Sequence, residues 1–112
     1  MTSAAKKEFE AIRRASTAAQ KDLYSADKAI AKKAESELGD VANALKAWAK
    51  RHGLKLREHV VTQPETETAR KRKCQSIIDI PGSAPETCVL VGIRRRGCLY
   101  SCFNALGPGL EF

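Results

Sequence analysis

The stretch 87–103 constrains the fold most, because two apolar runs flank a short basic turn that ends in glycine. Its sequence is Thr-Cys-Val-Leu-Val-Gly-Ile-Arg-Arg-Arg-Gly-Cys-Leu-Tyr-Ser-Cys-Phe, a pattern typical of a β-hairpin. A two-residue turn at Arg96-Gly97 would pair Ile93 with Tyr100 and Val91 with Cys102. The stretch therefore predicts two antiparallel strands that share an apolar face.

The first half of the chain has the composition and spacing of helices. Residues 3–52 contain no proline and one glycine, and alanine, lysine and glutamate favour helix. Apolar or small residues recur every three or four positions: Phe9, Ile12, Ser16, Ala19, Leu23, Ala26, Ile30, Ala34, Leu38, Val41, Leu45 and Trp48. We interpret Gly39-Asp40 as the break between two helices. The second helix, Val41–His52, then ends at Gly53, and Trp48 is expected in the core.

The second half predicts strands separated by turns. The runs 54–61 and 72–80 have strand-like patterns, a polar loop with a proline separates them, and the hairpin follows. The expected fold class is α+β, with two N-terminal helices packed on a C-terminal three- to four-stranded antiparallel sheet. We predict a single domain, 1–112, with a helical half (1–53), a sheet half (54–103) and a flexible tail (104–112).

Two basic runs, 70–73 and 94–96, are expected to meet at one end of this sheet. If Ile80 lies opposite Thr87, Lys73 faces Arg94, and Lys71 faces Arg96. The expected cluster comprises Arg70, Lys71, Arg72, Lys73, Arg94, Arg95 and Arg96. Like charges opposed across strands destabilise each other, so this arrangement suggests that an anion docks there. The alternative is that these side chains serve solubility at an exposed sheet end.

The net charge of +7 favours an anionic partner. The first hypothesis is a small basic nucleic-acid-binding or regulatory protein whose cluster engages phosphates of DNA or RNA. The alternative is a protein-binding module, an inhibitor or accessory subunit, that docks its basic end on an acidic or nucleic-acid-binding face of a partner protein. A homodimer through the N-terminal helices is a further hypothesis.

No catalytic motif stands out, so we expect a protein that is not an enzyme and uses no cofactor. His52 belongs to a helix end and His59 follows Glu58, and neither has a neighbour that completes a catalytic pair. A cysteine–histidine pair assembled by the fold is the remaining enzymatic alternative.

The four cysteines, Cys74, Cys88, Cys98 and Cys102, do not have the spacing of a zinc site. The favoured interpretation is that they are reduced and buried. A disulfide between neighbouring strands, with Cys74 and Cys88 as one candidate pair, is the alternative for an exported protein, and zinc ranks third. Because no apolar run approaches a membrane span and the N-terminus lacks a secretory pattern, we expect a cytoplasmic protein without a membrane partner.

Overall fold

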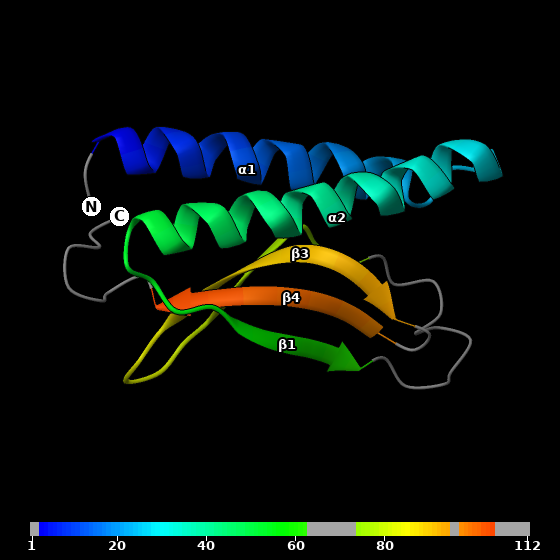
Figure 1. The fold of residues 1–112 in the computed structure, drawn as a ribbon. Coiled ribbons are helices and arrows are strands. Elements are labelled where there is room, and N and C mark those ends of the chain that lie inside the picture. Colours follow the sequence, from blue (N-terminus) through cyan, green and yellow to red (C-terminus); the bar gives the residue numbers. More distant parts are fainter. Residues whose placement is uncertain (1–2, 63–73, 95–96, 105–112) are drawn as a thin grey trace.

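A computed structural model describes residues 3–62, 74–94 and 97–104. Two antiparallel helices, α1 (Ser3–Asp22) and α2 (Lys28–Arg51), cover one face of a four-stranded sheet (Figure 1). The strands are β1 (Arg57–Thr62), β2 (Ile77–Ile80), β3 (Glu86–Arg94) and β4 (Gly97–Asn104), in the order β1-β4-β3-β2 with every pair antiparallel. The predicted α+β class is confirmed. Neither α1 nor α2 has a continuous apolar stretch of the kind that crosses a bilayer.

The predicted helix break at Gly39-Asp40 is wrong, because both residues lie inside α2. The helices separate instead at residues 23–27. Asp27 caps α2, and its carboxylate accepts hydrogen bonds from the backbone N–H groups of Ala29 and Ile30 at 2.9 and 3.4 Å. This cap satisfies amides that a helix start otherwise leaves unpaired.

Burial explains why α2 runs through Gly39. A helical glycine costs about 1 kcal/mol relative to alanine, whereas α2 buries a continuous row of side chains on either side of it: Ala34, Leu38, Val41, Leu45 and Trp48. The buried row in α1 comprises Ala5, Phe9, Ile12, Ser16 and Ala19, and Leu23, directly after this helix, is buried as well. Of the predicted apolar positions, Ala26 and Ile30 are exposed.

The predicted end of the second helix at Gly53 is confirmed. Gly53 has a φ of 68°, a left-handed conformation that glycine adopts without steric cost. The N–H of Leu54 donates to the carbonyl of Ala49 at 2.8 Å and that of Gly53 to Lys50 at 3.4 Å, which is the Schellman arrangement. Leu54 and Leu56 then pack on the core before β1 begins, so the first strand starts three residues later than the predicted Leu54.

The hairpin between β3 and β4 is confirmed, but its predicted register is wrong. Arg94 pairs with Gly97, Ile93 with Cys98 and, beyond a bulge at Val91, Leu90 with Tyr100. Gly97 lies in β4 and not in the turn. A Cβ at this position would come within 2.5 Å of the Val61 carbonyl oxygen on β1, so glycine permits the close β1–β4 approach.

The register between β2 and β3 also differs by one residue from the prediction. Ile80 pairs with Glu86, and Asp79 pairs with Thr87. The strand β2 is four residues long, shorter than the predicted 72–80, of which residues 72–73 lie outside the described ranges. The tail predicted at 104–112 lies outside them as well, except Asn104, which ends β4.

An aromatic cluster joins the helices to the sheet. The rings of Phe9, Trp48 and Phe103 lie 5.2–5.3 Å apart between centroids, and Trp48 is completely buried. Its indole N–H donates to the Ala5 carbonyl at 3.0 Å. The prediction that Trp48 belongs to the core is confirmed.

Candidate functional site

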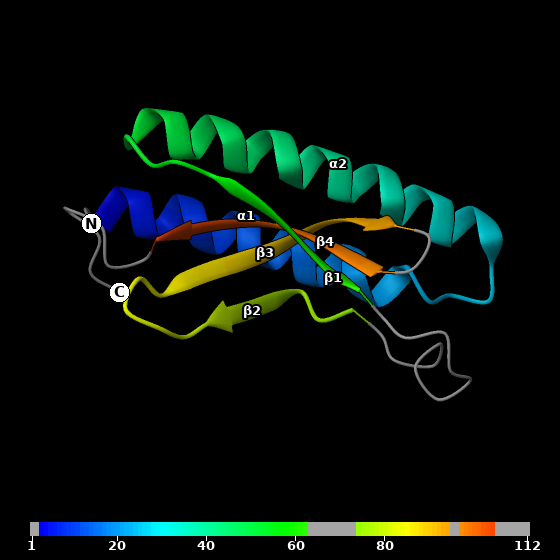
Figure 2. The same cartoon turned by 90° about the horizontal axis from the view of Figure 1, so that it is seen from below.

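The end of the sheet that carries the β3–β4 turn is the candidate site. The end of β1, the end of β3 and the start of β4 lie together there (Figures 1 and 2). Of the seven residues of the predicted basic cluster, Arg94 lies within the described ranges. It is the last residue of β3 and is exposed. The other six members, Arg70, Lys71, Arg72, Lys73, Arg95 and Arg96, lie outside the described residues, as do their predicted cross-strand pairings.

Both neighbours of the segment 63–73, which contains the basic run 70–73, are attached to this end. On the N-terminal side, Thr62 is the last residue of β1 and pairs with Gly97. On the C-terminal side, Cys74 forms a disulfide with Cys98, and their Cα atoms are 5.8 Å apart. The residues that precede and follow 63–73 are therefore both fixed to the start of β4, immediately after the second basic run.

Three side chains hold the segment that starts at Cys74. The Gln20 side-chain amide donates to the Cys74 carbonyl at 2.8 Å, and the Cys74 N–H donates to the Tyr24 hydroxyl at 2.6 Å. The Tyr100 hydroxyl donates to the Gln75 carbonyl at 2.7 Å. Burial raises the pKa of Tyr100, and the neighbouring Tyr24 adds to this effect. The attachment point is thus built from α1, the segment that follows it and β4.

The favoured interpretation of four reduced cysteines is wrong in this structure. A second disulfide joins Cys88 on β3 to Cys102 on β4, directly opposite each other in the register. The candidate pair Cys74–Cys88 is also wrong, because Ile78 of β2 occupies the position opposite Cys88. No cysteine is left as a thiolate for zinc, and no group of three potential metal-ligating side chains occurs in the described ranges.

Arg94 has no ion-pair partner among the described carboxylates, whereas Glu8 and Glu86 form ion pairs with arginines at the opposite end of the fold. Glu8 near the start of α1 bonds Arg51 at 2.9 Å, and Glu86 at the start of β3 bonds Arg57 at 2.6 Å. These hydrogen bonds lower the pKa values of both carboxyl groups. Within the described ranges, Arg94 is therefore an exposed arginine at this end of the sheet without a carboxylate partner.

The Arg57–Glu86 pair gives a pH-dependent stability. Because the folded-state pKa of Glu86 is lowered, the pair stabilises the fold above the ordinary carboxyl pKa of 4.5, and this contribution disappears as the pH falls through the lowered value. Glu86→Gln should therefore reduce the free energy of unfolding at pH 7 and have no effect in acid, measured by urea denaturation across pH. Glu58→Gln, at an exposed carboxylate of β1, is the matched control. An equal loss at every pH would contradict this account.

Sequence reasoning missed the attachment of Cys74. The relevant side chains, Gln20, Tyr24 and Tyr100, lie 25 to 54 residues away from their partners, and their spacing carries no local signal. The presence of four cysteines was the available signal for disulfides, but their spacing does not identify which pairs form.

Comparisons with protein-family models, with curated proteins and with solved structures find no match to this chain.

Proposed function

We propose that the basic end of the sheet binds the phosphates of a nucleic acid, and that the protein acts as a small nucleic-acid-binding or regulatory protein. The Cys74–Cys98 disulfide carries the proposal, because it joins the chain neighbour of Lys73 to the strand that follows Arg96. Both basic runs therefore start or end within two residues of one covalent link. The sequence predicted that the two basic runs meet because their strands pair. The disulfide supports the same proximity independently of that pairing.

Arginine predominates in this cluster, five residues to two lysines. Its planar guanidinium forms two parallel hydrogen bonds to a phosphate, which lysine cannot do. Arg94 is exposed and forms no ion pair with a carboxylate in the described part of the chain, which supports a role in binding an external anion. The proposal assigns no catalytic residue and no cofactor.

Binding to labelled single- and double-stranded DNA and RNA should weaken steeply as salt is added. Each phosphate contact adds roughly 0.7–0.9 to the slope of log affinity against log salt, so four contacts would give a slope of about −3. Fluorescence anisotropy at several salt concentrations measures it. We expect Arg94→Glu/Arg95→Glu/Arg96→Glu to abolish binding.

The matched control is Lys6→Glu/Lys7→Glu/Lys46→Glu, which makes the same change in net charge at exposed helix positions. If binding depends on the basic end, this control retains most of the affinity. Equal losses in the two variants would show a general charge effect instead. Absence of binding at low salt would overturn the proposal and leave the alternative, a basic docking face for a partner protein.

The cytoplasmic location remains a prediction, and it conflicts with the two disulfides. Cytosolic thiols are normally kept reduced, whereas disulfides persist in oxidising compartments. Trapping the thiols in intact cells with an alkylating reagent and counting the modified cysteines distinguishes the two. Four modified cysteines support the cytoplasm, and none supports an oxidising compartment.

A further inference from the structure

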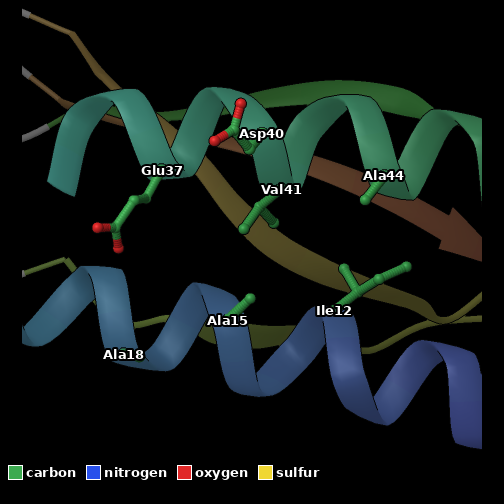
Figure 3. A pocket seen from close by; sticks show the side chains of 7 residues that line it. All are labelled: Ile12, Ala15, Ala18, Glu37, Asp40, Val41 and Ala44. Atoms are coloured by element: carbon green, nitrogen blue, oxygen red, sulfur yellow. The ribbon is translucent and has the colours of Figure 1, made fainter. Parts of the chain in front are cut away.

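The outer surface of the helix pair, on the side away from the sheet, contains a groove between α1 and α2 (Figure 3). Its cavity measures about 330 Å³. Buried Ile12 and Val41 form the floor, and exposed alanines of both helices form the walls: Ala15, Ala18 and Ala44. Because these side chains are small, another helix can approach closely.

A second set of positions on α2 follows a 3-4-3-4 spacing along this outer surface: Ile30, Lys33, Glu37, Asp40 and Ala44. Side chains that share one face of a helix have this spacing, and this row, the proposed seam, lies beside the buried row of α2. It has Ile30 and Ala44 at its ends and three charged side chains between them. The row therefore offers both apolar and charged groups to a partner on one outer face.

Ile30 is the apolar side chain that this surface offers to a partner. It is 43% exposed, although it is a large apolar residue in a helix. Ten residues separate it from Asp40 at the groove, which is about 15 Å along the helix. One copy of the chain therefore presents both an apolar protrusion and an apolar groove on the same face, which is what a two-fold symmetric contact requires.

The charges on this face complement each other in the same arrangement. Glu37 extends from α2 toward α1 beside Ala18, and the Asp40 carboxylate points away from the groove floor (Figure 3). Neither Glu37 nor exposed Lys33 has an ion-pair partner among the described residues. In an antiparallel α2–α2 contact, the register that sets Ile30 level with Asp40 of the other copy also sets Lys33 level with its Glu37. One register thus satisfies both the apolar and the charged groups.

We infer that this face is a homodimer interface, in which Ile30 of each copy enters the helix groove of the other and Lys33 pairs with the other copy's Glu37. The two-fold axis passes beside α2 at the level of Glu35. This inference gives the hypothesis of a dimer through the N-terminal helices a specific geometry. It does not depend on the proposed nucleic-acid binding, because the basic end of the sheet takes no part in it.

Sedimentation equilibrium of the full chain over a range of concentrations tests the interface. The protein should form a dimer, and Ile30→Glu should raise the dimer dissociation constant at least tenfold. Lys33→Glu and Glu37→Lys should each do the same, because each places like charges opposite one another twice. Lys46→Glu, an exposed α2 position outside the proposed seam, should have no effect. Circular dichroism verifies that every variant is folded.

Exchange of the charges at positions 33 and 37 tests the proposed pairing most directly. An equimolar mixture of Lys33→Glu and Glu37→Lys chains should form a heterodimer, and the double variant should regain self-association, because both arrangements restore two opposite-charge pairs. A monomer at every concentration would overturn the inference. A dimer that Ile30→Glu leaves intact, or failure of the double variant to recover, would also overturn it by placing the contact elsewhere.

Discussion

Reduction of the two disulfides should lower the free energy of unfolding by about 3 kcal/mol for each bridge, on the chain-entropy estimate. The bridges close loops with sequence separations of 24 residues for Cys74–Cys98 and 14 for Cys88–Cys102. Because a typical domain is stable by roughly 5–15 kcal/mol, the loss of both bridges should remove a large part of the stability. Urea denaturation with and without a thiol reductant measures the effect.

Two paired variants separate the contributions of the bridges. Cys88→Ala/Cys102→Ala should lose stability without affecting the basic end, since this bridge lies within the β3–β4 pair. Cys74→Ala/Cys98→Ala should lose stability and also weaken nucleic-acid binding, because it frees one attachment of the basic run 70–73. A chain that lacks all four cysteines should not respond to reductant.

The pairing itself is tested by peptide mapping under non-reducing conditions. Trypsin alone leaves Cys74 and Cys88 in one peptide and Cys98 and Cys102 in another, so it cannot identify the partners. Additional cleavage after Glu86 and after Tyr100 separates all four cysteines. Recovery of Cys74 joined to Cys88, or four free thiols in protein purified without reductant, would contradict the structure.

Trp48→Ala should lower the free energy of unfolding by about 4 kcal/mol, in the usual range for removing a large buried aromatic side chain. The indole fills the space between Phe9 and Phe103, with ring centroids 5.3 and 5.2 Å away. Its loss leaves a cavity where α1, α2 and β4 meet. The measurement is urea denaturation followed by circular dichroism.

Trp48→Phe is the matched control for this core position. It keeps an aromatic ring but removes the N–H that donates to the Ala5 carbonyl. A typical hydrogen bond contributes about 1 kcal/mol net, so this variant should lose clearly less stability than the alanine variant. A loss below about 1 kcal/mol for Trp48→Ala would show that the aromatic cluster does not organise the core.

Local chemistry along the chain determined the secondary structure classes and several ends. Glycine at position 53 and the apolar row that includes Leu45 and Trp48 predicted the end of α2 and its buried face, because helix capping and helical spacing depend on residues within one or two turns. The apolar runs around 94–97 predicted the β3–β4 hairpin for the same reason. The candidate basic cluster was likewise visible as two runs of charge.

Longer-range packing decided what local patterns left open. A helix passes through Gly39 because the buried row continues on both sides of it. The bulge at Val91 shifts the register between β3 and β4, and no local turn pattern predicts this shift. The cysteine partners depend on which strands become neighbours, and β1 joins β4 across 34 intervening residues. Four cysteines permit three pairings, so only the tertiary structure selects one and attaches the basic run to the sheet.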